Sequence, residues 1–273
     1  MGTLGQERLL FTLHVQWSLE FNNIVGGVML FEIEDAPKVM KTYNEYITNA
    51  PRELGAFFAW QMAPPLPFIP ENRHGDTFCA MVVCWAGSPD QAGKAIAPFR
   101  HAAHVVAEYI GPMPYPAMNS LFDGLVPPGL QHYWKAVYAR DLTDGAIEAH
   151  MKFGPKAPAV NSTVHIYPIN GAVQDVAAEA TAFGHREAKY ATVIAGMWPD
   201  AKQNEANIRW VKDYYAALAP HSEEGGYINF AAADDTDRVG ANFGSNYDKL
   251  RKLKAKYDPS NRFRINQNIT PLP

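Results

Sequence analysis

The chain has 273 residues, 47% of them hydrophobic, and a formal net charge of −4 from 24 Lys and Arg against 28 Asp and Glu. It can therefore bury a sizeable core, as one large domain or two small ones, and it lacks the basic excess that binds nucleic acid. The sequence contains no stretch near the roughly 18 unbroken apolar residues of a membrane span, and residues 1–21 lack the continuous apolar region of a secretory signal. We expect a cytoplasmic protein with neither nucleic acid nor a membrane as its partner.

The first half of the chain shows the periodicities of strands and helices in turn. Apolar and polar residues alternate from Phe11 to Phe21, which is the pattern of a half-buried strand. A long helix is expected after Ser88, where a capping serine precedes a proline. The elements expected between them are a strand at 26–33, a helix within 34–50, and strands at 55–63 and 76–86.

The two cysteines of the chain lie within the strand expected at 76–86. Cys79 and Cys84 are five positions apart, so their side chains should point to opposite faces of a sheet. We expect two core thiols there, with neither a disulfide nor a metal site.

The second half of the chain repeats this order of elements. We expect strands at 132–139, 161–169, 189–198 and 225–230, and helices at 143–153 and 200–218. Strand pairs joined directly and mixed with helical crossovers predict an α+β fold: a largely antiparallel sheet with helices on one face. The other face must meet water, a ligand or another domain.

Two segments rich in proline and glycine, residues 63–75 and 111–131, are expected to form neither helix nor strand. Their apolar side chains either wall a pocket or pack on the sheet beneath them. The side chains in question are Leu66, Phe68, Met113, Tyr115, Met118 and Phe122.

Most sequence signatures of catalysis are absent. The chain has no glycine-rich phosphate loop, no HExxH, no paired CxxC and no GxSxG. His101 and His104, three apart on the expected long helix, are either half of a metal site or a solvated pair. His185 and Arg186 either orient an anion or form a structural ion pair.

Three aromatic residues, Tyr133, Trp134 and Tyr167, lie in strands that could line the uncovered sheet face. A tyrosine in such a place either packs or acts as a hydrogen-bond donor or general base.

The C-terminal forty residues carry the richest pattern. A helix is expected after Asn246, with Tyr247, Leu250, Leu253 and Tyr257 on its apolar stripe. A turn over residues 258–261 follows, and Phe263 is expected to fold back as an apolar anchor. This anchor would bring three consecutive amide side chains, Asn266, Gln267 and Asn268, to a fixed place.

This last stretch, "NYDKLRKLKAKYDPSNRFRINQNI", closely resembles the C-terminal signature of the berberine bridge enzyme-like flavin oxidases, within the vanillyl-alcohol oxidase superfamily. Weaker similarities follow in the family's order upstream, among them "GPMPYPAMNSLFD", "HIYPINGAV" and "FGHREAKYATVIAGMW". The resemblance implies a substrate-binding domain at 1–225, a berberine-like C-terminal segment at 226–273, and FAD held mainly by an N-terminal domain absent from this sequence.

The resemblance also assigns roles to individual residues. Asn229, Asn266 and Asn268 match positions expected to approach the flavin, and Tyr227 matches an active-site aromatic. With Tyr133, it is a candidate phenol to assist proton removal. Phe230 and Val193 are apolar where several members carry a base or an assisting residue.

Two functions follow from these observations. The first is the substrate-binding part of an FAD-dependent oxidoreductase that oxidises a small organic substrate by hydride transfer, with a flavin-domain protein as partner. The alternative is a non-catalytic remnant that binds a small molecule or a protein. An uncovered apolar face would also allow a homodimer.

Overall fold

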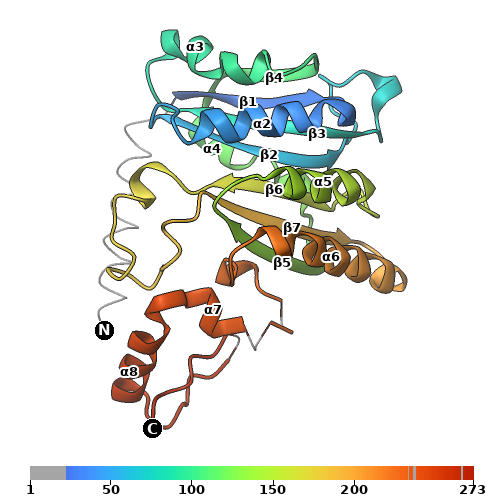
Figure 1. Ribbon diagram of the computed structural model, residues 1–273. Coiled ribbons are helices and arrows are strands. Elements are labelled where there is room, and N and C mark those ends of the chain that lie inside the picture. Colours follow the sequence, from blue (N-terminus) through green and yellow to red (C-terminus); the bar gives the residue numbers. More distant parts are fainter. Residues whose placement is uncertain (1–22, 233, 236–237, 266) are drawn as a thin grey trace.

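The computed structural model describes residues 23–273 apart from 233, 236, 237 and 266, so the strand expected at 11–21 and the predicted flavin contact Asn266 lie outside the described residues (Figure 1). The strands are β1 (Asn23–Phe31), β2 (Leu54–Met62), β3 (Thr77–Trp85), β4 (Val105–Pro114), β5 (Gln131–Ala139), β6 (Thr163–Pro168) and β7 (Tyr190–Trp198). The α-helices are α2 (Ala36–Ile47), α3 (Pro89–Arg100), α4 (Tyr115–Asn119), α5 (Asp144–Phe153), α6 (Asn204–Leu218), α7 (Val239–Phe243) and α8 (Tyr247–Tyr257).

The strands form one seven-stranded sheet in the order β4-β1-β3-β2-β6-β7-β5. Every neighbouring pair in it is antiparallel. Helices α2, α5 and α6 lie over the same side of this sheet (Figure 1). The predicted α+β fold, with an antiparallel sheet and helices on one face, is confirmed.

The largest core lies between the sheet and these helices. Because side chains alternate along a strand, Cys79 and Met81 of β3 point into this core, while Phe78 and Ala80 point to the opposite face. Cys79 is buried and Cys84, on the other parity, is half-buried, so the predicted opposite orientation of the two thiols is confirmed. Both are free thiols.

The element order strand, helix, strand, strand, helix occurs twice, as predicted: β1-α2-β2-β3-α3 and then β5-α5-β6-β7-α6. In the sheet, β1-β3-β2 is followed by β6-β7-β5, which is the same arrangement turned around the β2–β6 pair. The repeat therefore places β2 and β6 at the centre of the sheet.

Three predicted elements were wrong. Residues 225–230 do not form a strand, because Ile228–Phe230 is a 3-10 helix beside β5. The segment 111–131 is not all loop: β4 pairs with β1 as far as Pro114, and α4 follows at once. The long helix ends at Arg100, so His101 is its C-cap and His104 lies beyond it.

The C-terminal segment lies beyond the β5 edge of the sheet, where α7 and α8 stand apart from the other helices (Figure 1). The apolar stripe predicted on α8 is not buried: Leu253 and Tyr257 are exposed, and none of its residues is buried. Phe263 is 82% exposed and is not the predicted anchor. Asn246 makes no capping bond, because its Nδ2 donates to the carbonyl of Ala178 at 2.7 Å.

Among residues 23–273 that the structure describes, no helix has both the length and the apolar character needed to cross a membrane.

Candidate functional site

The sheet face opposite the helices carries an apolar cavity of about 320 Å³ over strands β1, β2 and β3. The segments 63–69 and 121–125 form its outer wall. Leu66, Phe68 and Phe122 line the pocket, as one of the two alternatives predicted, whereas Met113, Tyr115 and Met118 are not among its lining residues. Gln61 and His165 are the polar side chains among its described lining residues.

His165 lies on β6 at the centre of the sheet, opposite Ala59 of β2 and Val193 of β7. Its Nδ1 is 2.5 Å from the hydroxyl of Tyr167, two residues along the same strand face. Burial lowers the pKa of His165 to about 4 and raises the pKa of Tyr167 to about 12, so both side chains are neutral near pH 7. Phe57 packs against both rings, with its centroid 4.9 Å from each.

A second hollow adjoins this pair toward the C-terminal segment. Tyr227 lies in it, with its ring edge against Phe230 at 5.3 Å between centroids. The Nδ2 of Asn229 donates to the hydroxyl of Tyr227 at 3.0 Å. Val193 is buried in the neighbouring cluster on the same sheet face, against which Phe230 also packs. Tyr227, Phe230 and Val193 thus share the uncovered face.

Tyr133 does not point to this face. Its side chain has the parity of Val137 and packs against the helix-side core, with Lys212 of α6 over its ring. Its neighbour Trp134 does point to the uncovered face, where it packs against Phe230. The two tyrosines predicted as catalytic therefore lie on opposite sides of the sheet. The expectation that Tyr133 could line the uncovered face is wrong, because strand alternation puts Trp134 there.

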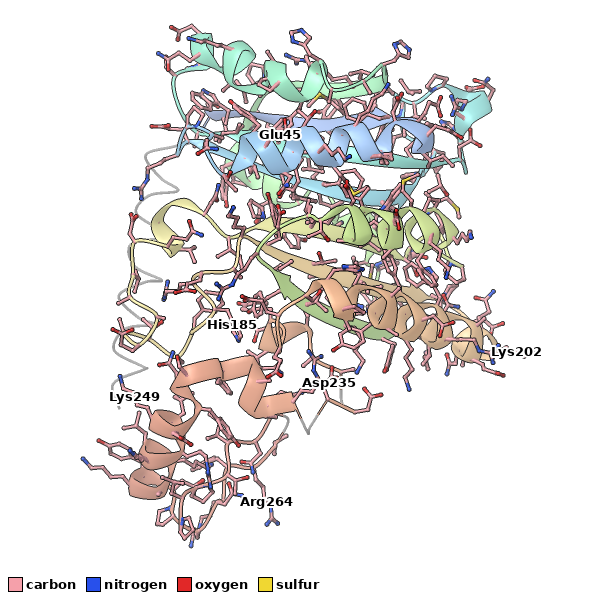
Figure 2. The ribbon with its side chains drawn as sticks, viewed as in Figure 1. Glu45, His185, Lys202, Asp235, Lys249 and Arg264 are labelled. Carbon is pink, nitrogen blue, oxygen red and sulfur yellow. The ribbon has the colours of Figure 1, made fainter. Side chains whose placement is uncertain are left out.

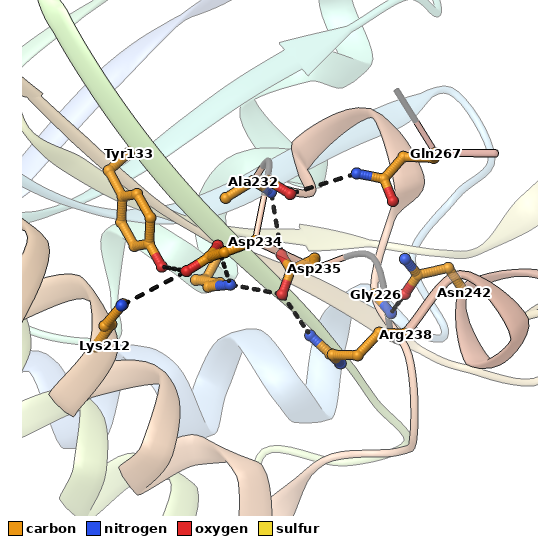
Figure 3. A network of polar contacts seen from close by, with 10 residues as sticks. Tyr133, Lys212, Gly226, Ala232, Asp234, Asp235, Arg238, Asn242 and Gln267 are labelled. Atoms are coloured by element: carbon orange, nitrogen blue, oxygen red, sulfur yellow. Dashed lines mark hydrogen bonds and ion pairs between the residues drawn. The ribbon is translucent and has the colours of Figure 1, made fainter. Parts of the chain in front are cut away.

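The hydroxyl of Tyr133 belongs to an ionic network that fastens the C-terminal segment to β5 (Figure 3). It donates to Asp234 at 2.7 Å, and Nζ of Lys135 lies 3.0 Å from Asp234 and 2.5 Å from Asp235. Burial, and then the hydrogen bond with Asp234, raise the pKa of Tyr133 to about 12. Burial opposes ionisation of Asp234, but its hydrogen bonds with Tyr133 and Lys135 lower its pKa to about 2. These hydrogen bonds and ion pairs hold the C-terminal segment against β5, so the hydroxyl of Tyr133 has a structural role.

His185 and Asp235 both lie where the C-terminal segment meets the sheet layer, whereas Lys249 and Arg264 lie farther out (Figure 2). His185 donates through Nε2 to the carbonyl of Ala241 at 2.9 Å and stacks on Tyr138. Arg186 lines the second hollow and donates to the carbonyl of Val173 and to Thr181. The His185 and Arg186 pair is thus held by neutral acceptors of the described chain.

The tail returns toward the sheet, where Nε2 of Gln267 lies 3.4 Å from the carbonyl of Ala232. The carbonyl oxygens of the Gln267 and Asn268 side chains are buried without a described partner. Asn268 and Asn229, two of the predicted flavin contacts, are therefore in segments that touch each other. Among the described residues, no group of three potential metal ligands is present.

Sequence reasoning missed His165 and Gln61. Both residues lie on strands that were predicted correctly, and their alternation with buried neighbours put them on the uncovered face. A polar residue in a central strand, at a position that alternates with buried apolar residues, was the signal available for each of them.

Comparison with solved structures defines the class of the fold. A berberine bridge enzyme variant solved in complex with (S)-reticuline aligns over 92% of this chain and 55% of its own, with a TM-score of 0.74 and 14% identity. The antiparallel sheet with one helical face is thus the fold of part of that berberine bridge enzyme.

Sequence comparison leads to the same class. Residues 226–270 match the family model described as berberine and berberine-like. An FAD-linked oxidoreductase of Dictyostelium discoideum is 27% identical over 194 residues, covering 70% of this chain and 42% of its own length. The FAD-linked oxidoreductase YvdP of Bacillus subtilis, itself uncharacterized, is 26% identical over 255 residues, 88% of this chain and 56% of its own.

The chain is therefore a relative of the berberine bridge enzyme-like FAD-linked oxidoreductases. It spans about half the length of these two relatives, 42% of one and 56% of the other.

Proposed function

We propose that this chain is the substrate-binding part of an FAD-dependent oxidoreductase that oxidises a small organic molecule. The observation that carries the proposal is the sheet face opposite the helices: it is apolar and hollowed, and it holds aromatic and amide side chains. We further propose that residues 1–225 form the substrate-binding domain, and that residues 226–273 pack on it and face a flavin-binding domain outside this sequence.

The residues present fit FAD along one side. The indole Nε1 of Trp134, on the sheet face opposite the helices, and the side-chain carbonyl of Asn268, in the tail, are buried without a described partner. Asn229, already turned toward that face by Tyr227, adds an amide. A flat ring system edged with hydrogen-bonding atoms would satisfy such groups. The proposed cofactor contacts remain Asn229, Asn266 and Asn268.

A bound flavin would supply the two-electron acceptor for the hydride. The chain's own residues would orient the substrate and handle the proton. Tyr227 is the better placed of the two predicted phenols, because it lines the second hollow and Asn229 fixes its hydroxyl. The hydroxyl of Tyr133 is already bound to Asp234 on the other side of the sheet. We therefore assign the proton-handling role to Tyr227.

The alternative is a non-catalytic remnant that binds a small molecule or a protein. The observation that favours it is the pair Val193 and Phe230, both apolar on the face where a proton acceptor would be needed. On this alternative the same face would bind a ligand, a flavin-domain protein or a second copy of the chain without turnover.

Reconstitution with a flavin domain tests the proposal. The chain is purified with excess FAD, alone and after co-expression with the flavin-binding half of the Bacillus relative, and the visible spectrum of each product is recorded. We expect flavin absorbance to be retained only in the two-chain preparation. Loss of that absorbance with Asn229→Leu, but not with Asn49→Leu in the exposed turn after α2, would support the assigned contacts. A two-chain complex that stays colourless would reject the proposal.

A further inference from the structure

We propose that the cavity over β1, β2 and β3 binds a small, uncharged, largely apolar molecule that carries one hydrogen-bond acceptor, held by His165, and one donor, held by Gln61. The inference deepens the proposed function, because it names the substrate class of the same sheet face. The binding experiment that tests it, however, needs no flavin.

His165 and Tyr167 share a hydrogen bond. A neutral imidazole has one donor and one acceptor nitrogen, and Nδ1 of His165 lies 2.5 Å from the hydroxyl of Tyr167, a pair in which either atom can donate. We assign the hydroxyl as the donor, which places the ring proton on Nε2. This Nε2 is buried and has no hydrogen-bond partner among the described residues.

Gln61 presents the complementary group. Its Nε2 donates to the carbonyls of Val160 at 2.9 Å and Met62 at 3.1 Å, so both amide hydrogens are used and the amide orientation is fixed. Its Oε1 is left buried without a described partner. The side chain thus offers a fixed acceptor to the cavity.

The strand register gives the spacing of the two groups. Ala59 pairs with His165 and Gln61 pairs with Thr163, so Gln61 and His165 are diagonal neighbours on one sheet face. The Cα atoms of such diagonal neighbours lie roughly 7 Å apart. A ligand bridging them would carry its two polar atoms about one aromatic ring apart.

The residues that line the cavity determine the charge, polarity and size of the ligand. The other described lining residues are aliphatic, aromatic, proline or glycine, and none carries a charge. A charged ligand would lose its hydration without a counter-ion, which is costly. The volume of about 320 Å³ is roughly twice that of an apolar cavity of ~150 Å³ that holds benzene, so one substituted ring or a fused pair fits.

A buried polar atom without a partner destabilises the chain unless a ligand satisfies it. One donor and one acceptor, each on a side chain that lines the same apolar cavity, would be satisfied together by the proposed ligand. A hydroxylated aromatic carbonyl compound has this combination of groups.

Four probes test the proposal on the full chain without flavin, by calorimetry at near-neutral pH: 4-hydroxyacetophenone, acetophenone, phenol and 4-hydroxybenzoate. We expect 4-hydroxyacetophenone to bind about tenfold more tightly than acetophenone or phenol, each of which lacks one polar group. We expect the carboxylate 4-hydroxybenzoate not to bind. Equal affinities across the panel, tight binding of the carboxylate, or no binding of any probe would overturn the proposal.

Two variants assign the groups. His165→Phe should weaken 4-hydroxyacetophenone and acetophenone about tenfold and leave phenol unchanged, while Gln61→Leu should weaken 4-hydroxyacetophenone and phenol and leave acetophenone unchanged. His104→Phe, at an exposed position, is the matched control. A uniform loss across all probes would contradict the assignment. If a variant fails to fold, the probe panel on the unaltered chain still decides the ligand class, and none of these outcomes depends on the flavin reconstitution.

Discussion

At the scale of single residues, the charged group that most needs its partners is Lys135. Its side chain is 8% exposed, and it lies against Asp235, which is 6% exposed, and Asp234, which is 48% exposed. Removing one member of a buried ion pair leaves the other charge uncompensated, at a cost of about 3–5 kcal/mol. We therefore expect Lys135→Met to lower the free energy of unfolding by about that amount, measured by urea denaturation.

Lys212 provides the matched control for this prediction. It also reaches Asp234, at 3.5 Å, but its side chain is 54% exposed. An exposed pair contributes about 0–1 kcal/mol, so Lys212→Met should change stability by no more than that. Equal effects of the two variants would show that the burial of Lys135 does not control the strength of the network.

His150 makes stability depend on pH. It is 1% exposed and lies 2.6 Å through Nδ1 from the hydroxyl of Tyr214, and burial lowers its pKa from 6.5 to about 3. Between these two values the unfolded chain binds a proton that the folded chain does not, so stability is complete above pH 6.5 and falls as the pH drops toward 3. The loss is about 1.4 kcal/mol per pH unit over this window.

The expected signature is a change of slope in a plot of unfolding free energy against pH. His150→Gln keeps a hydrogen-bonding group beside Tyr214 but cannot titrate, so the slope between pH 6.5 and 4.5 should decrease by about 1 kcal/mol per pH unit. An unaltered slope in His150→Gln would contradict the prediction, because it would mean that the pKa of His150 is the same in the folded and the unfolded chain. His165, whose pKa is also lowered, would then have to account for the acid sensitivity.

At the scale of elements, the junction of β1 with β4 depends on one glycine. Gly27 has a φ of 139°, and a Cβ there would lie 1.8 Å from the carbonyl oxygen of Tyr109 on β4. Gly111, on β4 itself, has nothing within 4 Å of the same position. We expect Gly27→Ala to destabilise the protein by about 2 kcal/mol or more, from the clash and the backbone strain. Gly111→Ala should be neutral or slightly stabilising. Thermal unfolding of both variants makes the comparison.

The elements also show how far local sequence pattern reaches. Strands β2, β3, β5 and β7 were predictable because their apolar runs end at turn residues, and α5 because Thr143 caps it through a bond from the amide of Ala146. β4 was missed because its glycine and prolines suit an edge strand as well as a loop. The predicted strand at 225–230 has strand-like composition, but Ile228–Phe230 turns as a 3-10 helix beside β5. The alternation of side chains along β5 was enough to predict that Tyr133 and Trp134 lie on opposite faces of the sheet. The cavity at His165 could not be predicted in this way, because it depends on the tertiary pairing of β2 with β6.

At the scale of the whole molecule, the two repeats form a continuous sheet around the β2–β6 pair, while the C-terminal segment lies outside it. The sheet and helices α2, α3, α5 and α6 share one core of buried side chains. Helix α8, in contrast, buries no residue and leaves Leu253 and Tyr257 exposed, as the tail leaves Phe263 and Ile265. The molecule thus joins a well-packed layer to a lightly packed C-terminal arm.

This difference predicts a gradient of local stability. Segments with few buried contacts open with small free energies, whereas core strands open only with global unfolding. In native-state hydrogen exchange followed by mass spectrometry, we expect the amides of β2, β3, β6 and β7 to share the highest protection and those of α8 to exchange far faster. The experiment is run at two protein concentrations tenfold apart. Protection of α8 equal to that of β3 at both would contradict the prediction. Protection that appears only at the higher concentration would indicate that a second copy of the chain covers the exposed side chains of α8 and the tail.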